Sequence, residues 1–203
     1  MRIEATQVAD GGCQITPPMD PRVRRTRKLL EDAFRVLVKQ KSFAALSVQD
    51  ITDYATVNRA TFYAHYTDKQ DLAASVLRND LRHNLLAQFH ERPAFTPHNL
   101  VLIAVGVFDF IDALLSDCPE TASELAGSVG NTLQEEIYQV IEHWLLISKA
   151  HLRLFPDCSK EMVATVISWS IYGGALRWNH TPNRPPAEEA CREIVAILFA
   201  PSR

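Results

Sequence analysis

The segment from residue 47 to 66 constrains the fold more than any other part of the chain. Ser47 stands three residues before Asp50, the spacing of an approximate capping box at the start of a helix. Apolar residues follow at helical spacing, and after a turn of only a few residues Asn58 is placed to cap a second helix. So short a turn fixes two helices at a steep angle, and the second of such a pair can enter the major groove of DNA. The segment therefore predicts a helix-turn-helix.

The second of these helices is expected to have a buried side and an outward side. Phe62 and Tyr66, one turn apart, point inward and complete a small core with apolar residues of the preceding helices. The outward side carries a cation, two hydroxyl groups, an imidazole and two small side chains: Arg59, Ala60, Thr61, Tyr63, Ala64 and His65. Such a face can press against DNA.

A longer helix precedes this pair and carries much of the basic charge. Asp20 and Pro21 are a strong helix start, because Asp caps free backbone N–H groups and Pro fits the first helical position. Apolar residues then recur at helical spacing to about Lys41. Residues 21–66 hold nine basic and four acidic side chains, a net charge of +5, whereas residues 79–203 have a net charge of -6. The front of the chain is therefore suited to an anionic polymer.

The remainder of the chain is predicted to be helical. No segment shows the alternation of a strand, so we predict an all-α fold. Caps, prolines and periodic apolar residues predict helices over residues 67–90, 97–115, 120–126, 131–155, 159–178 and 187–199. Gly127 and Gly130 are expected to interrupt the pattern, and Glu135 and Glu136 to form a solvated pair. The small Ser170 and Gly174 would let another helix approach closely.

The residues of the helix-turn-helix also resemble a known family. Residues 47–72, reading SVQDITDYATVNRATFYAHYTDKQDL, are similar to the DNA-binding motif of TetR-type (TetR/AcrR) transcriptional regulators, and the part TFYAHYTDKQDL is specific. The resemblance covers residues 22–77, while the rest agrees with the family in length and helical pattern. It assigns phosphate contacts to Tyr63, His65 and Lys69, a hydroxyl at a helix start to Ser47, and base contacts to Asn58, Arg59 and Thr61.

Physical chemistry supports these roles independently. Arg59, near a helix N-terminus, has the reach and paired donors to read a guanine edge, and Lys69 beside a helix start adds to an anion site. Exposed bases of the first helix are placed to follow the DNA backbone: Arg24, Arg25 and Lys28. The chain departs from the family pattern at Thr56 and Ala60, where related proteins often have glycine.

The helical remainder is expected to dimerise and to bind a ligand. One reading helix recognises few base pairs, whereas two, spaced by about one DNA turn of ~34 Å or somewhat more, read a palindrome. Residues 163–175 with 194–199 offer the helices of a four-helix bundle between two copies. For a small, largely apolar effector we predict a site lined by Phe108, Trp144, Trp169 and Tyr172. For each of these four, plain core packing is the alternative.

Other classes of function find little support in the sequence. Without a nucleophile elbow, P-loop or GxGxxG motif, we predict no enzymatic activity and no cofactor. A single Asp-x-x-His pair argues against a metal site, and the four separated cysteines favour free thiols, with a redox pair as the alternative. The most apolar stretch, residues 100–108, is followed by Asp109 and Asp112, so no run reaches the ~18 residues of a membrane span. With no apolar secretory block near the start, we predict a cytoplasmic protein.

Together these features predict three regions: a flexible arm over residues 1–19 with no assigned role, a DNA-binding domain over 20–66, and a ligand-sensing and dimerisation domain over 67–203. The predicted function is that of a TetR-like repressor released from a palindromic operator by a small molecule. The alternative is a helical interaction protein or an enzyme on an inherited fold, which would show no salt-sensitive binding to duplex DNA.

Overall fold

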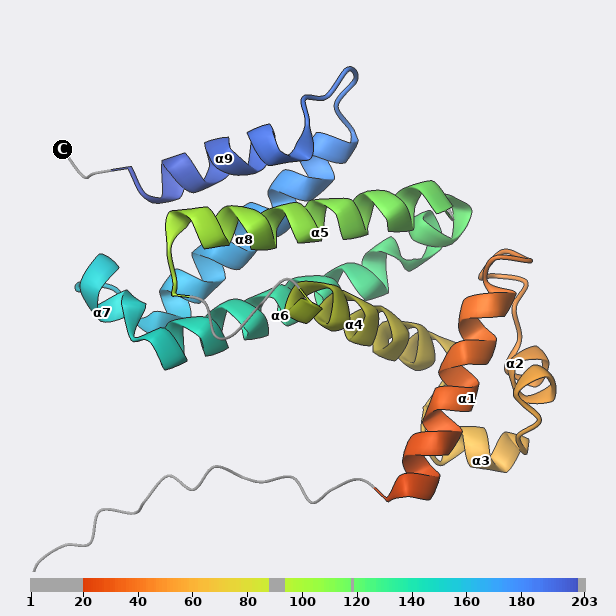
Figure 1. The fold of residues 1–203 in the computed structure, drawn as a ribbon. Helices are drawn as coiled ribbons and strands as arrows, with labels where there is room; N and C mark the ends of the chain where they lie inside the picture. The colour runs from red at the N-terminus through yellow and green to blue at the C-terminus, as the bar shows by residue number, and fades with distance from the viewer. Residues whose placement is uncertain (1–19, 88–93, 118, 201–203) are drawn as a thin grey trace, which may run out of the picture.

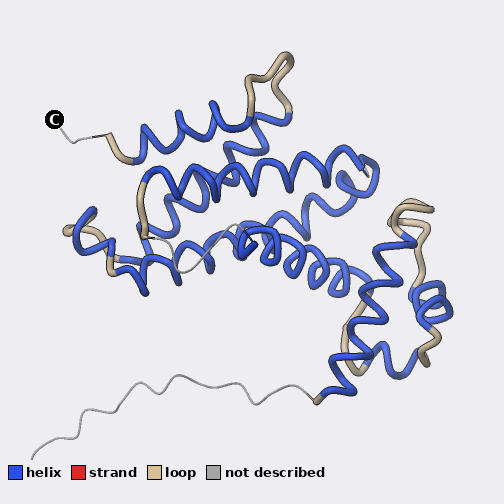
Figure 2. Tube along the Cα trace, viewed as in Figure 1, coloured by secondary structure: helices blue, strands red, loops and turns tan. Residues whose placement is uncertain are grey.

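The computed structural model describes residues 20–87, 94–117 and 119–200, with the side chains of residues 117–129 and 151 also outside the description. Every regular element in these ranges is a helix (Figures 1 and 2), which confirms the all-α fold class. The helices are α1 (Pro21–Leu37), α2 (Val48–Ala55), α3 (Arg59–Tyr63), α4 (Lys69–Ala87), α5 (Pro97–Asp117), α6 (Pro119–Ser148), α7 (Ala150–Leu154), α8 (Lys160–Asn179) and α9 (Ala187–Leu198). The arm predicted for residues 1–19 lies outside the described residues.

The helices are arranged as a small head and a larger body. In Figure 1, α1, α2 and α3 gather at one end, and α4 runs from this head into the body. Within the body α4 packs on α6 and α5, α6 packs on α8, and α9 covers α5 and α8. Helix α4 is therefore the element that contacts both the head, through α1, and the body.

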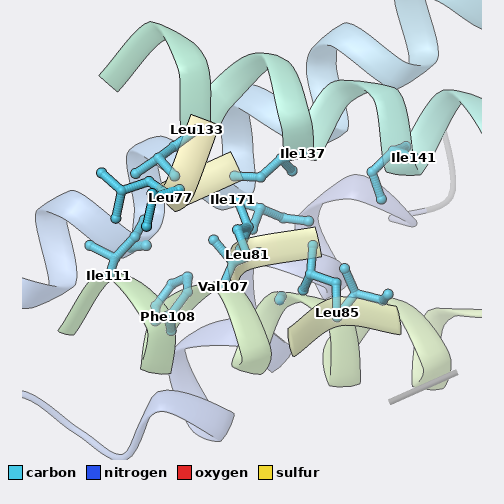
Figure 3. Packing of buried hydrophobic residues seen from close by; sticks show 14 of the residues in the cluster. Leu77, Leu81, Leu85, Val107, Phe108, Ile111, Leu133, Ile137, Ile141 and Ile171 are labelled. Carbon is cyan, nitrogen blue, oxygen red and sulfur yellow. The ribbon is translucent and has the colours of Figure 1, made fainter. Parts of the chain in front are cut away.

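The core of the body is apolar, and its centre is formed by side chains of α4, α5, α6 and α8. Figure 3 shows side chains that point toward one another from α4, α5, α6 and α8: Leu77, Leu81 and Leu85, Val107, Phe108 and Ile111, Leu133, Ile137 and Ile141, and Ile171. Each such side chain contributes roughly 1.5–3 kcal/mol when it is fully buried. This packing holds α4 against α6 along much of its length.

Helix α6 differs from the sequence prediction. It runs unbroken from Pro119 to Ser148, where a short helix, a break at Gly127 and Gly130 and a second helix were predicted. A glycine costs a helix only about 1 kcal/mol, so packing on neighbouring helices overrides it. At Gly130 a Cβ atom would lie 2.7 Å from the Tyr172 hydroxyl oxygen of α8, so glycine here serves close helix approach. The same reason, predicted for Gly174, is confirmed, because a Cβ there would overlap Ile194 of α9.

Two other helix predictions also change. Helix α1 ends at Leu37 and gives way to turns, short of the predicted end near Lys41. The predicted helix over residues 131–155 divides at Lys149, whose φ of 51° is left-handed, so that α6 and the short α7 are separate. The other predicted helices lie within a few residues of their observed bounds where these are described.

Helix α5 is longer than predicted, and it differs from the prediction that no apolar run reaches the length of a membrane span. The span from Pro97 to Ser116 is long and apolar enough to cross a membrane, with a mean hydropathy of 1.9, because Asp109 and Asp112 interrupt it less than we assumed. In this fold the helix packs against α4, α6, α8 and α9. Its inward residues are buried there: Leu100, Ile103, Ala104, Val107, Phe108 and Ile111.

The two cysteines within the described residues are free thiols. Cys191 of α9 is fully buried, and burial raises the pKa of its thiol to about 12. Cys158 is exposed in the loop after α7. A thiol with so high a pKa stays protonated and unreactive near neutral pH, which argues against a redox role for Cys191. The remaining two, Cys13 and Cys118, lie outside the described residues.

Candidate nucleic-acid interface

The start of α2 is held by the predicted capping box. The Asp50 N–H donates to the Ser47 hydroxyl oxygen at 3.1 Å, and the Ser47 N–H donates to the Asp50 carboxylate at 2.8 Å. The Lys41 ammonium lies 2.6 Å from the same carboxylate and, with the Ser47 bonds, holds the pKa of Asp50 well below its usual range. Ser47 is exposed at the helix start. Its hydroxyl is held in one orientation by the bond to Asp50.

The turn between α2 and α3 contains a strained residue. Thr56, the C-cap of α2, has φ 54° and ψ 42°, the left-handed conformation in which helices commonly end on glycine. A side chain with a Cβ pays roughly 1–2 kcal/mol for this conformation. The glycine that the family pattern often has at this position would avoid that cost. The departure at Thr56 thus keeps the turn and lowers its stability.

We expect Thr56→Gly to raise the free energy of unfolding by about 0.5–1 kcal/mol, because relief of the left-handed strain exceeds the extra entropy that glycine loses on folding. Urea unfolding of the full chain measures the change. Thr26→Gly, in the interior of α1 at an ordinary helical φ, is the matched control and should lower the stability by a similar amount. If Thr56→Gly lowered the free energy of unfolding, the claim that Thr56 is strained would be wrong.

Helix α3 is short and is anchored through its buried side. The Asn58 side-chain oxygen accepts the Ala60 N–H at 2.8 Å, which confirms the predicted cap. Phe62 is fully buried, with its ring 5.8 Å from that of Tyr66. The Tyr66 hydroxyl donates to Glu31 of α1 at 2.9 Å, and burial together with that carboxylate raises the pKa of Tyr66. The two aromatic residues predicted to be core are confirmed as core.

The outward side of α3 presents the predicted face. Arg59, Ala60 and Ala64 are exposed, Tyr63 is 49% exposed, and Thr61 and His65 are partly exposed. The Arg59 guanidinium lies 5.8 Å from the centre of the Tyr63 ring and donates to the Tyr63 hydroxyl at 3.4 Å. A cation stacked on an aromatic ring is partly ordered before any ligand binds. The face therefore offers a guanidinium and a phenol hydroxyl side by side.

The basic residues of α1 divide between two faces. Arg24, Arg25 and Lys28 are exposed, as their predicted role along the DNA backbone requires. Arg27 instead donates to the Ser75 hydroxyl of α4 at 3.0 Å, and Arg35 forms a two-pronged pair with Asp80 of α4 at 2.6 and 3.1 Å.

These inward contacts form a polar seam between α1 and α4, made of Arg27, Glu31 and Arg35 against Ser75, Asn79 and Asp80. Glu31 stands at its centre and accepts bonds from Tyr66 and Asn79. The sequence analysis counted Arg27 and Arg35 as charge available to DNA and missed the seam. Their spacing of four residues along α1 is the signal that could have placed Arg27, Glu31 and Arg35 on one face.

Lys69, predicted to contact a phosphate, is turned into the protein. Its ammonium donates to the backbone carbonyl oxygens of Phe43 at 2.8 Å, Ala44 at 3.1 Å and Leu46 at 2.8 Å. It also lies 4.7 Å from the centre of the Phe43 ring. In this conformation the three bonds use all three ammonium protons, and none is left for a phosphate.

The four residues predicted to line a ligand site have different surroundings. Phe108 is buried with its ring 5.4 Å from that of Trp178, whereas the Trp144 ring lies 4.6 Å from that of Phe95. Trp169 is 52% exposed and contacts the half-buried Tyr172 ring edge-on at 6.1 Å. Trp169 follows the buried stripe of α8 by two positions, which turns it outward. The structure therefore does not place Trp169 on the inner side of the body with the other three.

A groove between α5 and α9 was missed by the sequence analysis. It has a volume of about 650 Å³ and is lined mainly by Val101, Leu102, Val195 and Phe199, with His98 and Arg192 among its polar residues. No motif marks these residues, because they are separate in sequence and meet only when α9 packs on α5.

Comparisons with known proteins agree with the geometry of the head. Residues 29–76 match the model of a family described as bacterial regulatory proteins, tetR family. Over 61 residues the chain is 39% identical to a protein of Bacillus subtilis (strain 168) named uncharacterized HTH-type transcriptional regulator YxbF. That stretch is 30% of this chain and spans only 16% of the relative's length.

Solved structures resemble most of the chain in fold. The structure of RolR in complex with resorcinol has a TM-score of 0.63 at 14% identity, over 88% of this chain and 89% of that one. The transcriptional regulator FadR of Bacillus subtilis, in complex with stearoyl-CoA, has a TM-score of 0.54 at 14% identity, over 85% of this chain and 97% of that one. At such low identities these similarities show that head and body share an architecture with those proteins.

Proposed function

We propose, on the premise that this chain belongs to the TetR family of transcriptional regulators, that it is a repressor that binds a palindromic DNA operator as a homodimer and is released by a small molecule. The observation that carries the proposal is the α3 face, where exposed Arg59 and Tyr63 project from a helix anchored by the buried Phe62. We place the DNA-binding domain at residues 20–66 and the sensing and dimerisation domain at 67–203. We assign the chain no catalytic role and place it in the cytoplasm, where its DNA is.

Each residue of the α3 face has a proposed task on DNA. Arg59 and Thr61 would face base edges, and the Asn58 amide nitrogen is available to do so while its oxygen caps α3. Tyr63 and His65 would donate to phosphates, and the exposed Ser47 would contact the backbone from the start of α2. The exposed Cβ of Ala60 sets how closely the helix approaches the bases.

The body carries a surface suited to a second copy of the chain. Met162, Val166 and Trp169 are 58%, 47% and 52% exposed on α8, and their spacing of four and three residues puts them in one stripe. Ile197 of α9 is also exposed, at 76%. Large apolar side chains gathered on two adjacent helices are typical of protein interfaces. We propose that α8 and α9 of two copies form a four-helix bundle.

The effector is proposed to bind in the body. Two structures of similar fold are named with ligands that differ in size: resorcinol is a small aromatic diol, and stearoyl-CoA carries a long apolar acyl chain. Buried Phe108, Trp144 and half-buried Tyr172 remain the proposed lining, and the groove between α5 and α9 is a second candidate. Binding there would favour one spacing of the two heads over another, which is how a distant site changes affinity for DNA.

One experiment tests this function as a whole. DNA selected from a random pool by the purified chain is used in mobility shifts over a range of salt concentrations, and the shifts are repeated with resorcinol and with stearoyl-CoA. Binding to a palindrome, weakened by salt, supports the repressor. A chain that selects no sequence and binds duplex DNA without salt dependence would instead support the interaction protein or enzyme.

We expect Arg59→Ala to lower affinity for the selected palindrome by about 10- to 100-fold and to relax preference at a single base pair in each half-site. The reason is that a guanidinium paired with one base edge carries discrimination at that position only. Competitive mobility shifts against single-base variants of the palindrome measure it. Arg153→Ala, an exposed arginine of α7 far from the head, is the control and should leave both quantities unchanged. If Arg59→Ala lowered affinity equally for every DNA sequence, Arg59 would not contact a base.

A further inference from the structure

The Lys69 side chain spans two parts of the head that are distant in sequence. Lys69 is the first residue of α4, and the three carbonyl oxygens that it bonds belong to the turn before α2. Carbonyl oxygens that converge on one point need a donor with several protons, and a lysine ammonium supplies three. The Phe43 ring beneath the ammonium adds a cation–π contact. The arrangement accounts for the whole hydrogen-bonding capacity of this side chain.

The surroundings of Lys69 disfavour a phosphate. Its own helix start is occupied by carboxylates: Asp68 accepts the Asp71 N–H at 2.8 Å, and Asp71 accepts the Thr67 N–H at 2.9 Å. The Asp71 and Thr67 N–H groups at this helix start are thus bonded within the chain and are not offered to an anion. The two exposed carboxylates at the start of α4, those of Asp68 and Asp71, would also repel a phosphate that approached there.

From this geometry we infer that Lys69 is a positioning residue: it closes the chain from residue 46 to 69 into a clasp and does not bind DNA itself. Arg24, Arg25 and Lys28 of α1 lie outside this closed segment, and the other residues proposed to contact DNA lie inside it: Ser47, Asn58, Arg59, Thr61, Tyr63 and His65. The bond to the Leu46 carbonyl fixes the residue just before the Ser47 cap, and hence the start of α2. The inference rests on the proposed DNA binding and replaces the phosphate role predicted for this lysine.

Two substitutions separate a clasp from a phosphate contact. Lys69→Met keeps the aliphatic stem and removes charge and donors together. Lys69→Arg keeps the charge, so a phosphate contact would survive, but its planar fork does not match three converging carbonyls. The control is Lys39→Met, which removes an exposed lysine just after α1 in the same domain.

We expect both Lys69 variants to bind the selected palindrome and an unrelated duplex about tenfold more weakly than the unmutated chain, because ordering of the loop must then occur on binding. At temperatures well below the melting temperature, the loss of DNA affinity should be the same at every salt concentration. The slope of log affinity against log salt concentration should therefore be unchanged. The melting temperature should fall by about 2–6 °C in both. Lys39→Met should match the unmutated chain in melting temperature.

A lysine-labelling measurement needs no DNA. Reaction of the full chain with an N-hydroxysuccinimide ester, followed by mass spectrometry, should modify Lys69 much more slowly than Lys39. Equal labelling rates would overturn the clasp.

The DNA measurement can overturn the inference separately. A salt slope lowered by about 0.9 in Lys69→Met, with affinity retained in Lys69→Arg, would establish a phosphate contact instead. If the unmutated chain bound no duplex in a salt-dependent way, the proposed function would fail, while labelling and melting would still decide whether Lys69 is a clasp.

Discussion

Arg82→Ala is expected to lower the free energy of unfolding by about 3 kcal/mol, because it leaves a buried carboxylate without its cation. Glu136 of α6 is only 3% exposed, and the Arg82 Nε atom lies 2.5 Å from its Oε1 atom. The arginine itself is 52% exposed, so water can partly replace it, which sets the loss toward the lower end for buried pairs. Urea unfolding of the full chain measures the change.

A double substitution shows whether the loss comes from the stranded charge. Arg82→Met with Glu136→Leu removes both charges and should restore the stability to within about 1 kcal/mol of the original. Arg192→Ala breaks an ion pair with Glu188 in which both side chains are more than 60% exposed, and should cost less than about 1 kcal/mol. A small loss in Arg82→Ala, similar to that of Arg192→Ala, would contradict this account of Glu136.

The Arg82 pair matters because of where it lies on α4. Two residues earlier, Asp80 holds Arg35 of the head, so opposite sides of a single turn of α4 are ion-paired to the head and to the body. Apolar contacts of Leu77, Leu81 and Leu85 lock the inner side of α4, but they carry no directional bonds. The two ion pairs are therefore directional contacts of α4 with the head and with α6, beside the other polar bonds of the seam between α1 and α4. A change in the body that moved α6 would reach the head along this route.

What the sequence could predict follows from local rules. The capping box at Ser47, the cap at Asn58 and the inward turn of Phe62 depend on residues within one helix or its ends, and all three are confirmed. The left-handed Thr56 was visible only as a departure from a family pattern. Its conformation is set by the helices on either side of it.

The predictions that changed depend on contacts between distant segments. Glu136 was predicted to be solvated, but α4 brings Arg82 to it from 54 residues away. The phosphate role of Lys69 stays a prediction, but charge alone could not show that three carbonyls lie within reach of its ammonium. Trp169 was grouped with a ligand site because aromatic content does not show which side of α8 faces the core. In each case the type of side chain was known from the sequence, but the residues that surround it in the fold could not be known from the sequence.

Trp169→Glu is expected to convert the proposed dimer into monomers and to lower affinity for the palindrome by about 10²- to 10⁴-fold. A charge in the middle of the stripe formed with Met162 and Val166 would be buried without a partner if two copies met there. Two heads held in one dimer bind at an effective concentration that a single head lacks, and this advantage is worth about 10²–10⁴ in affinity. Sedimentation equilibrium measures the assembly, and mobility shifts on full and half palindromes measure the binding.

The comparison between full and half sites isolates the cause. If only dimerisation is lost, Trp169→Glu should bind a half-site as tightly as one head of the unmutated chain does, because no residue of the head has changed. Leu152→Glu places the same charge at a residue of α7 that is 62% exposed and outside the stripe, and it should remain dimeric. A dimer that persists in Trp169→Glu would assign the interface to another surface. A half-site affinity that falls together with the full-site affinity would show that the body acts on the head within one copy, through α4.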